Sequence, residues 1–513
     1  MGFGLQPYVT SAFSLHSLTS ATSVMSSLIG GLTKLPLAKL IDIWGRPQGY
    51  MIMVSSLTLG LIMMAGCNGV ETYAAAQVFY WIGQNGTDYV VSVFVADTSH
   101  LKNRGLMFAL LASPYIITSW VSGPLAEAFL GLEFVEEVPV ITGPGWRWAY
   151  GTFAIITPLI ALPLFGLFQY NYRKAVNSGL MPAHQSNRTT FQSIKHYLVQ
   201  FDAFGLLLIV AGLALFLLPF NIYSYQAKGF GSPMIICMVV FGLLLLVGFG
   251  CWERFGAKVT FVPYHLLKDR TVLGSNLLAA VLFFGFYMWN GMFSSFLQVV
   301  PGLTITEASY IGNIYSIGSC LWSFAAGALI SKTGRFKVQA LYFGVPVTLL
   351  GAGLMIKFRQ PDVNIGYIIM CQIFIAFAGG TLVITEQIAV MAAATHQYVA
   401  VVLALQGMFS SVGGAIGQTV STAIWTGTFR ENLVRFMPES EAANIPSVYG
   451  SLAEQLAYPV GSAARTGIQM AYGESQKIMY IAAVASLAMM FPCVIAWRNY
   501  DLKQHKQVKG TVI

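Results

Sequence analysis

Charged residues are scarce in this chain. Asp, Glu, Lys and Arg make up 9% of its 513 residues, whereas 56% are hydrophobic and the mean hydropathy is +0.66. This scarcity excludes an ordinary soluble protein. The apolar residues form continuous runs rather than alternating, which excludes a membrane β-barrel. Because many runs could cross about 30 Å of hydrocarbon, the sequence predicts an all-α polytopic membrane protein in a lipid bilayer.

Motifs for nucleotide and metal binding are also missing. The phosphate-binding pattern Gly-x-x-x-x-Gly-Lys-Ser/Thr does not occur, so ATP is not the expected energy source. The seven histidines are scattered, there is no Cys-x-x-Cys, and the six cysteines lie in apolar runs. We expect no cofactor, no resident metal and no enzymatic activity. The net charge of +8 is read as a topology signal, so no nucleic-acid partner is expected.

One motif occurs twice. A small apolar run closed by Gly-Arg ends at Arg46 and again at Arg335, 289 residues later. The same offset relates Asp97 to Glu386, and each of these acids follows a long apolar run. Two halves with matching hydropathy and matching charged residues are typical of a duplicated membrane transporter.

The apolar runs predict thirteen spans. They lie near 17–41, 49–70, 75–96, 106–130, 148–169, 203–223, 234–252, 273–299, 308–330, 339–356, 366–386, 399–426 and 477–497. The spans near 203 and 234 have no partner under the offset, so we interpret them as a pair inserted between two six-helix halves. The odd count and the abrupt start predict a fourteen-helix parent whose first helix is truncated here.

This interpretation divides the chain into seven segments. They are an N-terminal half at 1–169 with an incomplete first helix, a cytosolic connector at 170–202, the inserted helix pair at 203–252, the core of the C-terminal half at 273–426, an extracellular loop at 428–476, the last transmembrane helix at 477–497 and a cytosolic tail at 498–513. If the loop that begins at Asp42 is placed on the cytosolic side of the membrane, 20 of the 28 basic residues lie at or towards the cytosol, as the positive-inside rule requires.

Several motifs resemble the major facilitator superfamily. These are the Asp-x-x-Gly-Arg loop from Asp42 to Arg46, the loop from Asp97 to Arg104, Gly123-Pro124, and Gly145-Trp-Arg-Trp148. Further stretches are similar to its fourteen-helix fungal siderophore-iron transporter branch: Phe13-Ser-x-His-Ser-Leu18, Pro36-x-Ala-Lys39, Ser113-Pro-Tyr-Ile-Ile-Thr118, Gly145-Trp-Arg-Trp-Ala-Tyr-Gly151 and Ala471-Tyr-Gly473.

The resemblance implies a monomeric proton symporter that imports ferric siderophore chelates, hydroxamates above all, by alternating access. The expected location is the plasma membrane, with an endosomal or vacuolar membrane as the alternative. Two other functions stay open. One is a proton antiporter that exports glutathione or drugs on the same fold, and the other is a receptor that senses a chelate without transporting it.

Charges inside the predicted spans are candidates for proton coupling, because an intramembrane charge needs a partner or water. Asp88 lies nine residues before Asp97, close to mid-membrane, and we predict that it couples transport to protons. The alternative is a structural pair with Lys34, which lies at a similar depth. Glu127 follows Gly123-Pro124 near the external side and is a candidate proton-entry or substrate-contact residue; the alternative is a solvated helix end.

The repeat also predicts a gate on the cytosolic side. Each half carries one guanidinium and one carboxylate there, Arg46 with Asp97 and Arg335 with Glu386. We predict that both pairs form when this side is closed. The expected gating residues are Asp42, Arg46, Asp97, Arg104, Arg335 and Glu386.

Two groups are candidate substrate contacts. The first lies in the first helix of the second half and comprises Phe284, Tyr287, Trp289 and Asn290; the alternative role for its aromatic rings is packing. The second comprises Arg465 and Tyr472 in the loop at 428–476, which we expect to be a mobile cover over the cavity mouth; the alternative is a passive polar loop.

Overall fold

A computed structural model describes residues 28–135, 138–141, 143–178, 190–223, 228–260, 264–395 and 398–503, with positions 5, 9, 26 and 226. Most of the expected truncated first helix and most of the expected tail at 498–513 lie outside the described residues. The same holds for the side chain of Asp42.

The first half of the described chain consists of long helices joined by tight turns. They are α3 (Lys34–Trp44), α4 (Arg46–Gly66), α5 (Val70–Thr98), η2 (Leu101–Asn103), α6 (Arg104–Ala112), α7 (Pro114–Leu130) and α8 (Gly145–Asn177). Gly45 ends α3 with a φ of +94°, a conformation that glycine adopts at low cost, and Pro47 fits the first turn of α4. This turn places Arg46 at the end of the bundle.

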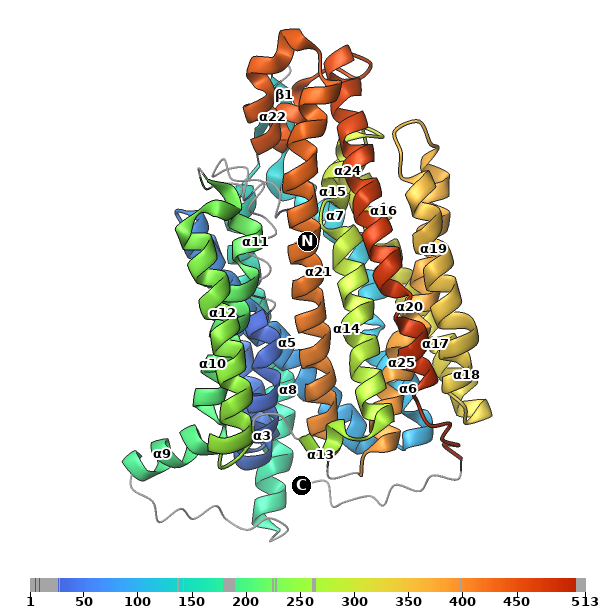
Figure 1. Cartoon of the computed structure of the whole chain (residues 1–513). Coiled ribbons are helices and arrows are strands. Elements are labelled where there is room, and N and C mark those ends of the chain that lie inside the picture. Colours follow the sequence, from blue (N-terminus) through green and yellow to red (C-terminus); the bar gives the residue numbers. More distant parts are fainter. Residues whose placement is uncertain are drawn as a thin grey trace.

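Short elements and the inserted pair follow. They are the antiparallel strands β1 (Leu132–Val135) and β2 (Val138–Ile141), then α9 (Thr190–Gln200), α10 (Ala203–Leu217), α11 (Pro219–Ile222), η4 (Gly229–Gly231), α12 (Pro233–Cys251), η5 (Trp252–Gly256) and α13 (Tyr264–Leu267). The hairpin is a small departure from the all-α prediction, and it joins two helices at one end of the bundle (Figure 1).

The second half repeats the arrangement of long helices. Its elements are α14 (Arg270–Asn290), α15 (Phe293–Val299), α16 (Ile305–Gly312), α17 (Ile314–Thr333), α18 (Lys337–Gln339), η6 (Ala340–Gly344), α19 (Val345–Phe358), α20 (Ile365–Ala393), α21 (Val399–Phe436), η8 (Glu439–Asn444), α22 (Ile445–Gly450), α23 (Leu452–Ala457), α24 (Ala463–Leu487) and α25 (Met490–Ile495).

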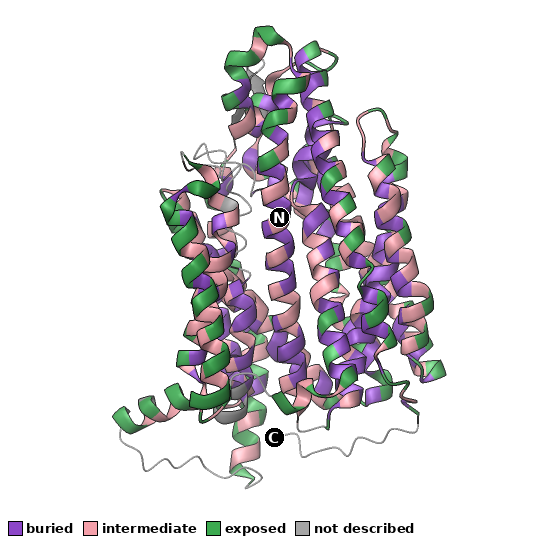
Figure 2. Cartoon of the chain, in the orientation of Figure 1, coloured by how far each residue is buried: buried purple, intermediate pink, exposed green. Residues whose placement is uncertain are grey.

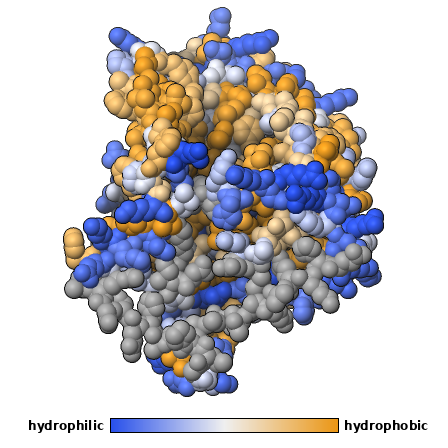
Figure 3. All heavy atoms as spheres, turned by 60° about the horizontal axis from the view of Figure 1, so that its bottom comes forward, coloured by the Kyte–Doolittle hydropathy of each residue, from blue (hydrophilic) through white to orange (hydrophobic). Residues whose placement is uncertain are grey.

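Within the described residues, ten helical segments are long and apolar enough to cross a membrane, or eleven if the bent α9–α10 pair is one span. The long helix α5 is not among them, because polar residues such as Gln77, Gln84 and Asp88 interrupt its apolar surface. Buried residues concentrate where central helices meet, and the outer side of α12 is exposed (Figure 2). Figure 3 turns the lower end of the bundle towards the viewer. Hydrophilic residues cluster at this end, whereas the side of the bundle above it is largely hydrophobic.

The two halves meet along two seams. On one, α6 and α7 pack against α17 and α16, and on the other α3 packs against α21. A Cβ at Gly327 would lie 2.9 Å from the Gly105 backbone, so only glycine lets α17 and α6 approach so closely. The inserted helix pair packs against the second seam, where Leu217 of α10 contacts Leu28 and Ala415.

The loop expected at 428–476 is much shorter in the structure. Helix α21 continues to Phe436 and α24 begins at Ala463, so only residues 437–462 connect them, and these form the short helices η8, α22 and α23. The sequence expectation was wrong here because polar residues such as Arg430 and Glu431 were taken as loop. They are equally compatible with a helix that projects beyond the membrane.

Candidate functional site

A cavity of ≈ 280 Å³ lies between the two halves. Helices α3, α5 and α6 supply one wall with Lys34, Trp81, Asn85, Asp88, Tyr89, Ser92 and Phe108. Helices α14, α20 and α21 supply the other with Phe283, Tyr287, Val383, Glu386, Gln387, Leu403, Gln406, Gly407, Ser410 and Ser411. A site at the seam between repeats is where secondary transporters bind their cargo.

Asp88 projects into this cavity from a polar face of α5. Trp81, Asn85, Asp88 and Ser92 recur at a helical spacing, so one side of α5 turns all of them to the cavity. The Gln84 amide donates to Asp88 Oδ2 at 3.1 Å, and the carboxylate is exposed to the cavity space. Asp88 lies ten residues before Thr98, about 15 Å from the helix end at 1.5 Å per residue.

Lys34 enters the same cavity from α3 and reaches across to the second half. A Cβ at Gly407 of α21 would lie 2.8 Å from Lys34 Cδ and 2.9 Å from its Nζ, so the missing side chain makes room for the lysine. The charges of Lys34 and Asp88 interact. However, the ion pairs formed within 4.0 Å among the described residues do not include these two. The structural-pair alternative therefore lacks a direct contact.

Glu386 is the second carboxylate of the cavity, which corrects its expected pairing with Arg335. Helix α20 continues seven residues beyond Glu386, so the acid lies about 10 Å inside the bundle at 1.5 Å per residue. It is 2% exposed, next to Gln406, and its Oε2 has no hydrogen-bond partner. Arg335 stands exposed after the turn at Gly334, and the ion pairs of the described residues do not include it.

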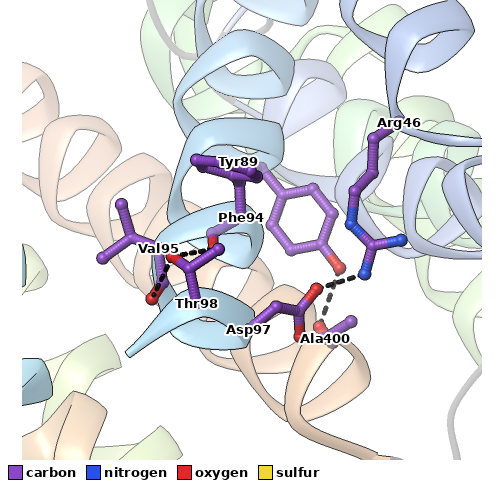
Figure 4. Close-up of polar contacts among 7 residues, drawn as sticks. All are labelled: Arg46, Tyr89, Phe94, Val95, Asp97, Thr98 and Ala400. Atoms are coloured by element: carbon purple, nitrogen blue, oxygen red, sulfur yellow. Dashed lines mark hydrogen bonds and ion pairs between the residues drawn. The ribbon is translucent and has the colours of Figure 1, made fainter. Parts of the chain in front are cut away.

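The other expected pair is present. The Arg46 guanidinium forms an ion pair with Asp97, and both side chains are largely buried (Figure 4). Beside this pair the Tyr89 hydroxyl donates to the Ala400 carbonyl of α21 at 2.8 Å, which joins the halves. Arg104, 2% exposed, places Nη1 3.9 Å from Met391 Sδ on α20. These contacts lie between the cavity and the predicted cytosolic end, and the gating role itself stays a prediction.

Glu127 lies at the first seam and is not among the cavity residues. It accepts a hydrogen bond from the Thr306 hydroxyl of α16. Two turns further along, Asn313 Nδ2 donates to the Ser119 carbonyl and to Ser122 Oγ, both at 3.1 Å. Glu127 is thus part of a polar contact between the halves rather than a solvated helix end. Its role in proton entry stays a prediction.

Of the four aromatic-cluster candidates, Tyr287 alone is among the cavity residues; Phe283, one helical turn earlier, joins it. Phe284 follows on another face, where its backbone packs against Gly417. Trp289 is 3% exposed and packs edge-on against Phe286. Asn290, half-buried, ends α14 and is likewise absent from the cavity lining. For Trp289 the packing alternative holds, because successive helix residues turn by about 100°.

The expected mobile residues Arg465 and Tyr472 are buried in α24. Arg465 is 2% exposed and donates to the Gln455 carbonyl at 2.5 Å and the Val299 carbonyl at 3.1 Å. Tyr472 is fully buried and donates to Gln455 Oε1 at 2.8 Å. Together they fasten the short helix α23 to α15 and α24. In this structure both side chains are therefore held in contacts within the protein, and their movement over the cavity mouth stays a prediction.

Sequence reasoning missed several cavity residues that carry hydrogen-bonding groups. On α5 these are Asn85 and Ser92, and on α21 they are Gln406, Ser410 and Ser411. The signal was present as polar residues at intervals of three, four and seven within apolar helices, which marks a face turned to a cavity or a partner.

Comparisons with known proteins decide the family. The family model described as Major Facilitator Superfamily matches residues 2–263. The "MFS siderochrome iron transporter 1" of Ajellomyces capsulatus is 59% identical over 513 residues, 100% of this chain and 85% of the relative. The "Siderophore iron transporter mirB" of Emericella nidulans is 41% identical over 511 residues, 99% of this chain and 83% of the relative.

The chain belongs to the major facilitator superfamily, in the fungal siderophore-iron transporter family. It is a multi-pass membrane transporter and not an enzyme. Solved structures agree on the fold alone. The human organic anion transporter MFSD10 is 11% identical, with a TM-score of 0.52 over 92% of this chain and 84% of that chain. An auto-inhibited POT family peptide transporter is 16% identical, with a TM-score of 0.51 over 97% and 94%.

Proposed function

We propose that this transporter imports ferric siderophore chelates of the hydroxamate type by proton symport, as a monomer in the plasma membrane. The names of its relatives support the cargo. The observation that carries the mechanism is the cavity between the halves, with Asp88 exposed in it. A site that both halves line can open alternately to either side when the halves rock against each other.

The cavity wall suits a bulky chelate with an oxygen-rich shell. Trp81, Phe283 and Tyr287 offer aromatic faces to the organic part of the ligand, and the amides of Asn85 and Gln387 can bond its carbonyl oxygens. The iron arrives already chelated and is cargo. At ≈ 280 Å³ the cavity lies at the small end of ligand pockets, so it must widen when a chelate enters.

Proton coupling would use the carboxylates inside this cavity. Asp88 on the first half faces the cavity space, and Glu386 on the second half lies in its wall with one oxygen lacking a partner. An ionised carboxylate inside the membrane raises the free energy of the protein unless it has an ionic partner or contacts water. Protonation of the carboxylate removes this cost, and it therefore shifts the equilibrium between the two arrangements of the halves. The Lys34 ammonium, reaching over Gly407, is the nearby cation that can respond to this change.

The test is uptake of iron-55 from a panel of ferric chelates by yeast that lacks its own siderophore uptake. We expect accumulation from hydroxamate chelates that collapses when the proton gradient is dissipated. Glutathione release without chelate uptake would replace the proposal with an exporter. Chelate binding without accumulation would replace it with a receptor. Surface biotinylation of the same cells tests the plasma-membrane location.

A further inference from the structure

Helix α9 differs from every long helix of the bundle in direction. It lies across the lower end of the inserted pair (Figure 1) and meets α10 at an angle of 52°. The turn between them is at Asp202, the one non-glycine residue with positive φ (+45°) among those described. The Asp202 Oδ1 atom accepts two hydrogen bonds. One comes from the backbone N–H of Gly205 in α10, and the other comes from Nε1 of Trp252 at the end of α12. This clasp fixes α9 beside the lower ends of α10 and α12.

Aromatic contacts hold α9 from its other side. The Tyr197 ring lies edge-on to Trp44, at the end of α3, with centroids 5.5 Å apart, and it stacks on Phe201. These contacts leave other apolar side chains of α9 in the open, namely Phe191, which is 77% exposed, Leu198 and Val199. Phe255, 84% exposed, stands beyond the end of α12. A helix that lies across the end of a membrane-spanning bundle with exposed apolar side chains is typical of the membrane interface.

Exposed basic side chains occur on the same helix and at the ends of the neighbouring helices. Five exposed cations lie at the ends of α8 and α12 and on α9, and they are Arg173, Lys174, Lys195, Arg254 and Lys258. Over the described stretches 170–178, 190–204 and 251–260 the acids are Asp202, which is buried in the clasp, and Glu253. The surface thus combines a positive charge excess with unburied apolar groups. We name it the α9 surface.

We propose that the α9 surface binds anionic phospholipid from the leaflet that most basic residues of the chain face. Exposed ammonium and guanidinium groups fit a lipid phosphate, while Phe191 and Phe255 can lie among acyl chains. Nucleic acid would use the cations but leave the apolar side chains in water. This binding is independent of the cargo and of the proton coupling proposed above.

The experiment titrates the full chain in detergent with phosphatidylserine or phosphatidylcholine and counts bound lipids by native mass spectrometry. For the wild-type chain we expect phosphatidylserine adducts at concentrations at least tenfold below those for phosphatidylcholine. The variant K195Q/R254Q/K258Q should lose at least tenfold in phosphatidylserine affinity, because each cation near an anionic lipid surface strengthens binding. Its phosphatidylcholine binding should not change.

The matched control removes three exposed cations from the same end of the second half, K268Q/K332Q/K503Q. It should bind phosphatidylserine within twofold of wild type. Glycerophosphoserine, which is the headgroup without acyl chains, should not compete; full competition would reassign the surface to soluble phosphate compounds. Equal loss in both triple variants, or no preference of the wild-type chain for phosphatidylserine, would overturn the proposal. Thermal unfolding of both variants verifies that they are folded.

Discussion

The lower ends of the two halves carry the same residue types at different depths. In the first half, α5 ends one residue after Asp97, so the carboxylate lies at the rim and reaches Arg46. In the second half, α20 runs seven residues past Glu386, which carries that acid into the cavity wall and away from Arg335. Distance from the helix end, rather than position in the repeat, decides which charges meet.

The difference gives the cavity one carboxylate from each half. Asp88 is exposed and accepts a hydrogen bond from Gln84, whereas Glu386 is buried beside Gln406. The two halves are therefore unlike in both places. At the rim, the first half has the pair of Arg46 with Asp97, whereas the second half pairs Arg498 with Asp269 instead of the repeat-related Arg335 with Glu386. In the middle, the two acids differ in exposure. Variants can separate these three features by the size of their effects.

Asp88→Asn should have the largest effect, a loss of concentrative iron-55 uptake to the level of cells without the transporter. The amide keeps the shape and the Gln84 contact but cannot exchange a proton. Binding of the chelate in the absence of energy should persist. Uptake is measured against surface expression of the same variant.

The control is Glu71→Gln, which changes an exposed acid in the first turn of the same helix and should leave uptake within twofold. Accumulation by Asp88→Asn that still follows the proton gradient would remove Asp88 from the coupling mechanism.

Glu386→Gln should reduce uptake by about tenfold, less than Asp88→Asn because this acid is not exposed to the cavity space. The charge swap Glu386→Arg with Arg335→Glu should recover nothing, since the two side chains do not form an ion pair in the described structure. The measurement is iron-55 uptake by Glu386→Gln, by the single variants Glu386→Arg and Arg335→Glu, and by the double variant that combines the last two.

Recovery by this double swap would show that the pair forms in another state of the transporter and would restore the symmetric gate predicted from the repeat. Wild-type uptake by Glu386→Gln would make the acid structural only.

The sequence was sufficient to predict the helical bundle, the long helix that carries Asp88 and the position of Asp88 well inside it. It misplaced Glu386 because Glu386-Gln387 was read as the end of a span. The following residues to Ala393 extend the helix, and both polar side chains lie in the cavity wall rather than at the membrane surface. Arg465 and Tyr472 were read as loop for the same reason, since hydropathy does not distinguish polar groups buried against protein from groups in water.

Arg46→Asp should reduce uptake about fivefold by placing two carboxylates at the rim. Adding Asp97→Arg should restore at least part of the loss, because the ion pair can form with its partners exchanged. For a partly buried pair the expected coupling is about 1 kcal/mol. Uptake rates of the two single variants and the double variant give this coupling directly.

Absence of any recovery, at normal surface expression, would separate Arg46 and Asp97 into independent helix-end caps. It would also remove the contrast between the rims of the two halves, leaving the cavity acids as their remaining difference.

Gly407→Ala should have the smallest effect, about a twofold loss of uptake. The added methyl group would lie 2.8 Å from Lys34 Cδ and 2.9 Å from Nζ, closer than real contacts allow, so the flexible lysine side chain must move aside. In a Lys34→Ala background the same substitution should cost nothing further, because the crowded atoms are gone. Gly353→Ala is the control, since a Cβ there meets nothing within 4 Å. If Gly407→Ala lowers uptake by the same factor with and without Lys34, the lysine does not cross the seam over this glycine during transport, and the two cavity acids would lack the cation that links the halves.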